Sequence, residues 1–171
     1  MSYYVYAYLT DANKVSSVFS SNDPNIYEAL STSLKDDLGN LDNYFSEYTN
    51  AQKNVSEVLK DIINGEVRFP DIPFMYGYVY EKICEYFGEQ IYNAEYIWEL
   101  EEQSAFIPIP FSTDFPYIIS VEKYRLQEKK SKFIALKYGI GNCDYEEEIK
   151  DLTYILDKAI EESRDLVICV Y

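Results

Sequence analysis

Carboxylates are the side chains that could do acid–base or metal chemistry in this chain, because none of its 171 residues is histidine. Histidine is the usual general base and metal ligand near neutral pH, so its absence excludes Ser-His-Asp and Cys-His mechanisms. Acidic residues cluster at Asp36-Asp37, at Glu99 with Glu101 and Glu102, and at Glu146–Glu148. None of these clusters has the alternating spacing and turn glycine of a calcium loop, so we expect solvated charge and no metal site. A histidine-free enzyme that pairs carboxylates distant in the sequence stays an alternative.

A glycine pair at Gly139-Ile140-Gly141 lies between an apolar run and an expected helix, which is the setting of a phosphate-binding loop. Asp144 stands where the third glycine of that motif belongs, and Glu146–Glu148 follow at the helix start. These carboxylates would repel a phosphate, whereas they suit the positive end of a helix dipole. The pair therefore predicts a turn, and the sequence predicts no cofactor.

The three cysteines, Cys84, Cys143 and Cys169, are far apart and form no Cys-x-x-Cys motif. Their odd number, without a secretory signal, indicates a reducing cytoplasm and no disulfide framework. We expect Cys84 and Cys169 to be buried as small apolar side chains. No apolar run reaches the roughly 20 residues that a membrane helix needs, so no membrane partner is expected.

The stretch 85–102 has the composition of a binding surface, since acidic and aromatic residues alternate there without any Lys or Arg. Aromatic side chains supply buried contact area, and carboxylates steer and pair with a basic partner. The residues expected to contact that partner are Glu89, Tyr92, Glu95, Tyr96, Trp98, Glu99, Glu101 and Glu102. The alternative is that Ile97, Trp98 and Leu100 pack inward while the acids only solvate the surface.

Charge is unevenly balanced, with 30 acidic against 15 basic residues and a formal net charge of −15. Such a charge repels nucleic acids and anionic membranes, and it favours a basic protein partner or simply solubility. One segment is basic instead, and its cations are Lys123, Arg125, Lys129, Lys130, Lys132 and Lys137. This segment could bind an anion, but we favour neutralisation of an acidic helix within the fold, or plain solvation.

The two ends of the chain are expected to be strands of one small sheet. Tyr3 to Leu9 is an apolar run typical of a strand covered on both faces, and Leu166 to Tyr171 is similar. Between them the pattern is mainly helical, so the sequence predicts a mostly helical α+β fold in which residues 1–171 form a single domain.

Several helix boundaries are predicted from caps and glycines. Thr10 or Asp11 should cap a short helix, and Asp23-Pro24 should begin a second helix that Gly39 ends. Asn40 to Lys53 is expected to be a loop or a weak helix. A third helix is predicted from Val55 to its end at Gly65, and a fourth over Tyr76 to Phe87 with Gly88 as its cap. A strand is predicted at Tyr117–Ile119. It is followed by a helix that Ser120 caps and that runs toward Ala135, and by a last helix that begins at Asn142 or Asp144.

Several local motifs resemble the YfbM-like group of small uncharacterised bacterial proteins. They are Ser2–Ala7, Ile83–Gly88, the Ile107–Pro110 run with Asp114–Pro116, and Asp165–Val167. The resemblance implies a cytoplasmic α+β protein without an established activity. The resemblance also implies a place among the immunity proteins that neutralise toxins of competing bacteria.

We therefore expect a non-catalytic protein, most concretely an acidic immunity or inhibitor protein for a basic toxin such as a nuclease. A phage-type DNA mimic that blocks host defence is an alternative, since it would use the same charge. A DNA mimic would need carboxylates spaced like phosphates over an elongated surface. The apolar stripes of the expected helices indicate a compact domain instead.

Overall fold

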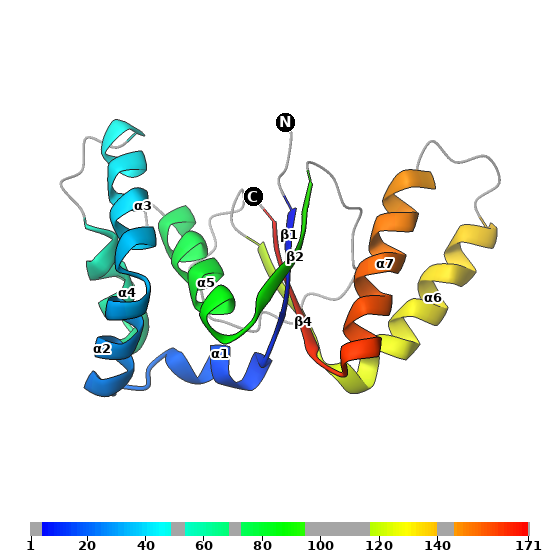
Figure 1. Ribbon diagram of the computed structural model, residues 1–171, viewed down its shortest axis with the longest axis horizontal. Coiled ribbons are helices and arrows are strands. Elements are labelled where there is room, and N and C mark those ends of the chain that lie inside the picture. Colours follow the sequence, from blue (N-terminus) through cyan, green and yellow to red (C-terminus); the bar gives the residue numbers. More distant parts are fainter. Residues whose placement is uncertain (1–4, 49–53, 69–72, 95–116, 140–145, 171) are drawn as a thin grey trace.

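Four strands form one antiparallel sheet at the centre of the computed structural model, which describes residues 5–48, 54–68, 73–94, 117–139 and 146–170 (Figure 1). The strands are β1 (Val5–Thr10), β2 (Glu89–Ala94), β3 (Tyr117–Val121) and β4 (Asp165–Val170). Their order is β2-β1-β4-β3, so the strands from the two ends of the chain are the central pair. This confirms the predicted α+β class and the sheet built from both chain ends.

The two central strands are buried on both faces, as predicted. Alternate side chains of a strand point to opposite faces, and each face here meets its own apolar cluster. One cluster takes Val5, Ala7, Leu9, Leu166 and Ile168, and the other takes Tyr8, Val167 and Cys169. The apolar runs at the chain ends are therefore continuous because each strand contributes side chains to an apolar cluster on either face of the sheet.

Helices cover the sheet on both sides (Figure 1). On one side lie α1 (Ala12–Val18) and α5 (Pro73–Phe87), with α2 (Pro24–Ser33), α3 (Lys35–Tyr48) and α4 (Val55–Asn64) farther from the sheet. The other side carries α6 (Leu126–Gly139) and α7 (Glu146–Glu162), and the short 3-10 helix η1 (Lys123–Arg125) precedes α6. None of these helices, in the part of the chain described, has the length and apolar character needed to cross a membrane.

The predicted caps Asp11 and Asp23 are present, and Asn54 caps a third helix start that had no predicted cap. Each of the three accepts a hydrogen bond from a backbone amide of the first turn. At the other end of α4, Gly65 adopts a left-handed conformation with φ of 70°. Its missing side chain also matters, because a Cβ there would lie 2.7 Å from the Ser20 side chain.

Two predicted boundaries were wrong. Gly39 does not end a helix, because α2 already ends at Ser33 and α3 continues through Gly39 to Tyr48. Of the loop or weak helix expected from Asn40 onward, the helix is therefore what forms as far as Tyr48. Leu34 and Leu38 stay buried across this junction, so packing outweighs the roughly 1 kcal/mol that a mid-helix glycine costs. Ser120 is no helix cap either, because it lies within β3, where the buried Val121 continues the strand.

Strand β2 was not predicted. It follows α5 directly, and Gly88 makes this close connection possible. A Cβ on Gly88 would lie 2.0 Å from the Leu9 carbonyl oxygen and 2.7 Å from Cβ of Thr10. The backbone of β1 therefore passes where any other residue would place its side chain.

Replacing Gly88 by alanine should destabilise the fold by about 2 kcal/mol or more, because the strand β1 must move to admit the methyl group. Gly39→Ala is the matched control, since nothing lies within 4 Å of the added Cβ. That variant should stabilise the protein by about 0.5 to 1 kcal/mol through helix propensity. Urea unfolding measures both, and equal effects of the two substitutions would show that the Gly88 contact is unimportant.

Candidate functional site

A fully buried carboxylate, Asp61, organises the outer helical layer. It lies among the buried residues of α4, one helical turn after Val58. Its Oδ1 accepts a hydrogen bond of 2.5 Å from Nε of Arg68, and its Oδ2 accepts one of 3.0 Å from the Tyr76 hydroxyl. Because Tyr76 belongs to α5, the carboxylate joins α4 to α5 and fixes the segment that follows Gly65.

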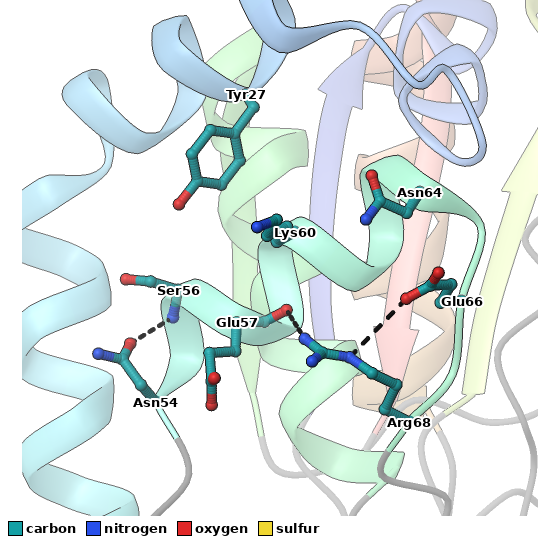
Figure 2. Close-up of a pocket in the computed structure, with 8 residues that line it drawn as sticks. All are labelled: Tyr27, Asn54, Ser56, Glu57, Lys60, Asn64, Glu66 and Arg68. Atoms are coloured by element: carbon teal, nitrogen blue, oxygen red, sulfur yellow. Dashed lines mark hydrogen bonds and ion pairs between the residues drawn. The ribbon is translucent and has the colours of Figure 1, made fainter.

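A polar pocket of about 440 Å³ lies beside this network (Figure 2). The exposed face of α4 and the segment after it form most of its lining, and the Tyr27 side chain extends toward them from α2. The lining residues are Tyr27, Asn54, Ser56, Glu57, Lys60, Asn64, Glu66 and Arg68. The pocket is thus formed by the side of α4 opposite to its core-facing residues.

Arg68 is held at the edge of the pocket by several groups. Besides its bond to Asp61, its Nε lies 3.8 Å from a Glu66 carboxylate oxygen, and its NH2 group donates to the Glu57 carbonyl oxygen at 3.5 Å (Figure 2). The hydrogen bond to Asp61 also raises the pKa of the guanidinium. Its charge is therefore matched by a carboxylate beneath the pocket.

The remaining charges of the pocket are two carboxylates and one ammonium group. Glu57, Lys60 and Glu66 are exposed. Within the described residues, neither Glu57 nor Lys60 forms an ion pair through its side chain. With Arg68 balanced by Asp61, the pocket carries a net charge of about −1.

The backbone amides at the start of α4 are already occupied. Val55 donates its amide to Oδ1 of Asp42 at 2.5 Å, and Ser56 donates to Oδ1 of Asn54 at 2.7 Å. An anion at a helix N-terminus needs such amides to be free. The pocket therefore suits a cation better than an anion.

A second buried acid, Glu81 of α5, faces the sheet and is only 6% exposed. Burial raises its pKa to about 7, although the nearby Tyr8 hydroxyl and Lys82 offset part of the rise. Neither the Tyr8 hydroxyl nor Oε2 of Glu81 makes a hydrogen bond of normal geometry. A neutral carboxyl is consistent with this buried position, which lies near the Tyr8 and Cys169 side chains of the apolar cluster.

Two of the residues predicted to contact a partner are described, and both make contacts within the protein. Glu89 pairs with Arg164 at 3.0 Å while its side chain stays 53% exposed. Tyr92 is half-buried, and its hydroxyl donates to Oδ2 of Asp151 on α7 at 2.7 Å. These contacts attach β2 to the C-terminal part of the fold. The other predicted contact residues, Glu95, Tyr96, Trp98, Glu99, Glu101 and Glu102, lie outside the described residues and stay predictions.

Other predicted features can be located as well. Cys84 and Cys169 are fully buried, as expected, whereas Cys143 lies outside the described residues, as do Ile140 and Gly141 of the glycine pair. In the basic segment, Lys130 pairs with Asp157 of α7, which confirms neutralisation within the fold for this residue. Over the ranges that the structure describes, no group of three or more Cys, Asp or Glu residues could hold a metal ion.

The sequence reasoning missed the network of Asp61, Arg68 and Tyr76. A signal was present, because Asp61 interrupts the apolar stripe of α4 one helical turn after Val58. A carboxylate in such a stripe is nearly always paired when it is buried. Its partners could not be identified from spacing alone, since Tyr76 is 15 residues away on another helix.

Comparison with known proteins gives one match. Residues 1–106 match a family model described as "Domain of unknown function (DUF7691)". No curated protein and no solved structure matches the chain. The matched residues contain the strands β1 and β2 and the whole outer helical layer, including the pocket. The family description does not test the resemblance to the YfbM-like group, which stays a prediction.

Substituting Asp61 by asparagine should destabilise the protein by about 2 to 4 kcal/mol, because Arg68 would lose the charge that balances it and Tyr76 a strong acceptor. Tyr76→Phe should cost about 1 kcal/mol, since the carboxylate keeps Arg68. Urea unfolding of both variants and of the double variant gives the coupling between them. If the losses in the free energy of unfolding simply add, the hydrogen bond between the Tyr76 hydroxyl and the Asp61 carboxylate contributes nothing to stability.

Ionisation of Glu81 should destabilise the fold as the pH rises. The folded-state pKa, about 7, lies above the ordinary value of 4.5, so the favourable contribution is complete below pH 4.5 and is lost as the pH rises through 7. Glu81→Gln should therefore gain stability relative to the wild type between pH 5 and pH 8, by an amount on the order of 3 kcal/mol. Thermal unfolding across this range measures the difference. Glu28→Gln, on the exposed side of α2, controls for the loss of one negative charge, and a pH-independent difference for Glu81→Gln would contradict the account.

Proposed function

The chain belongs to the DUF7691 family, whose description states no activity, and from the geometry of its acidic helical layer we propose that it acts by binding a basic protein. More specifically, it is an immunity or inhibitor protein that neutralises a basic toxin, such as a nuclease, in the cytoplasm. Catalysis has no part in this proposal. The support comes from where the charge lies and from the pocket within the charged layer.

The observation that carries the proposal is the uneven division of charge along the chain. Residues 1–106 contain 18 acidic and 6 basic residues, a net charge of −12, whereas residues 107–171 contain 12 and 9, a net charge of −3. The family match covers the first of these parts. A charge needed only for solubility has no reason to be concentrated in one part of the fold.

The acidic layer is formed by α2, α3 and α4 with the segment that follows α4. Its carboxylates that are described as at least partly exposed are Glu28, Asp36, Asp37, Asp42, Glu57 and Glu66. The same stretch, residues 24–48 and 54–68, contains three basic residues: Lys35, Lys60 and Arg68. A one-signed surface of this kind attracts a basic protein from a distance and speeds its association.

A nuclease suits such a surface for a chemical reason. Its substrate is a chain of phosphates, so its binding cleft is basic. Carboxylates that cover the cleft replace those phosphates and exclude the substrate. The resemblance to the YfbM-like group, with its place among immunity proteins, supports the same conclusion.

The proposal predicts a one-to-one complex with a basic protein encoded beside this gene. Binding should be tight at about 25 mM salt and at least about tenfold weaker at about 300 mM, because the attraction is screened. Calorimetry or surface plasmon resonance with the purified neighbour measures it. Failure of every basic neighbour to form a stoichiometric complex at low salt would refute the proposal.

A matched pair of variants tests where the partner binds. Replacing Glu28 and Asp36 of the acidic layer by Gln and Asn should lower the association rate constant several-fold, because two charges that attract the partner are lost. Neutralising Glu161 and Glu162, which are exposed on α7, removes the same charge from the other side of the sheet. Equal effects of the two pairs would indicate that only the net charge matters.

A further inference from the structure

We infer that the pocket between α2 and α4 binds one arginine side chain of the partner, with its guanidinium group near Glu57 and Glu66. The identity of the partner rests on the proposed function, but the chemistry of the pocket can be tested without it. The pocket, at about 440 Å³, is within the range of sites that hold small ligands. It therefore has room for a long side chain and accompanying water.

Electrostatics favours a cation in this pocket. Glu57 and Glu66 are exposed carboxylates, and the charge of Arg68 is already matched by Asp61 at 2.5 Å. The nearby Asp42 adds a further negative charge, and it takes the Val55 amide that an anion would need. An incoming guanidinium would meet two carboxylates, opposed by Lys60 and by Arg68, whose charge Asp61 matches.

The shape of the lining favours a guanidinium over a compact ammonium group. Tyr27 presents a half-buried aromatic ring from α2, and guanidinium groups stack on such rings. The side-chain amides of Asn54 and Asn64 offer carbonyl oxygens as further acceptors. A planar group with five donors can use several of these acceptors at once.

Arg68 shows that this environment already accommodates a guanidinium. It contacts a buried carboxylate, a second carboxylate at 3.8 Å and a backbone carbonyl oxygen at 3.5 Å. A partner arginine would use the exposed carboxylates of Glu57 and Glu66, which lie on either side of Arg68 (Figure 2).

Lys60 is the group that opposes this ligand. Its ammonium lies on the same exposed face of α4 and forms no ion pair within the described residues. Removing this charge should therefore strengthen arginine binding, whereas it should weaken the binding of an anion. The sign of the Lys60 effect thus separates the two kinds of ligand.

The test uses the full chain and N-acetyl-arginine amide, whose only charge is the guanidinium. Titration followed by ¹⁵N NMR should shift the amides around Tyr27, Glu57 and Asn64 in a saturable manner. N-acetyl-citrulline amide, which has nearly the same shape without the charge, should bind at least about fivefold more weakly. The double variant Glu57→Gln with Glu66→Gln should lose about fivefold to tenfold in affinity, and Lys60→Gln should gain about threefold.

Controls and contrary outcomes are defined by the same set of variants. Glu161→Gln with Glu162→Gln removes the same charge from α7 and should leave the titration unchanged. All substituted side chains are exposed, and unchanged melting temperatures will show that the fold persists. Equal binding of the citrulline analogue, shifts located away from the pocket, or weaker binding by Lys60→Gln would each overturn the inference.

Failure of this inference is distinguishable from failure of the proposed function. If a basic partner binds the Glu57→Gln, Glu66→Gln variant as tightly as the wild type, the pocket is not its arginine site, although the protein still binds basic partners. If the arginine analogue titrates into the pocket but no basic protein forms a complex at low salt, the pocket assignment stands and the proposed function fails.

Discussion

The pairing of β1 with β4 is the constraint on which the rest of the structure depends. Six consecutive pairs join Val5–Thr10 to Asp165–Val170, so the two ends of the chain are aligned residue by residue. A shift by one residue would exchange the side chains of the two apolar clusters, and each cluster holds a different set of helices against the sheet. The Asp165 carboxylate secures the same region, because its two oxygens accept from the amides of Ala12 and Lys123 at 3.0 and 2.9 Å.

A short series of buried contacts connects the sheet to the pocket and positions the elements that line it. Tyr8 of β1 and Tyr76 of α5 belong to the same apolar cluster, and the hydroxyl of Tyr76 reaches Asp61 of α4. Asp61 in turn holds Arg68 at the edge of the pocket. The side chains that line the pocket are exposed or half-buried, but the elements that carry them are positioned by buried contacts. Such preorganisation lowers the entropic cost of binding.

The sequence allowed a good prediction of those parts of the fold that one segment determines alone. The apolar runs at Val5–Thr10 and Asp165–Val170 and the stripe of Val55–Asn64 carry their own period, so they were assigned correctly. Strand β2 was missed because it is an edge strand with exposed polar residues such as Glu89 and Gln90 and a bulge at its pairing with β1. The Asp61 site was missed for another reason: Asp61 stands out in the stripe of α4, but its partner Tyr76 is reached only when α4 packs on α5, and no local pattern identifies that partner.

Burial divides the acids of this protein into groups with different consequences. Asp61 is buried and paired with Arg68, whereas burial raises the pKa of Glu81 toward neutrality, so neither presents a free negative charge to a partner. Repulsion among the remaining carboxylates opposes folding, and the sheet and its two apolar cores must offset it. Carboxylates concentrated on the outer helices, far from the central strands, keep this repulsion away from the pairing of β1 with β4 (Figure 1). The same placement leaves them accessible to a basic protein, so the arrangement that least disturbs the fold is also the one best suited to binding.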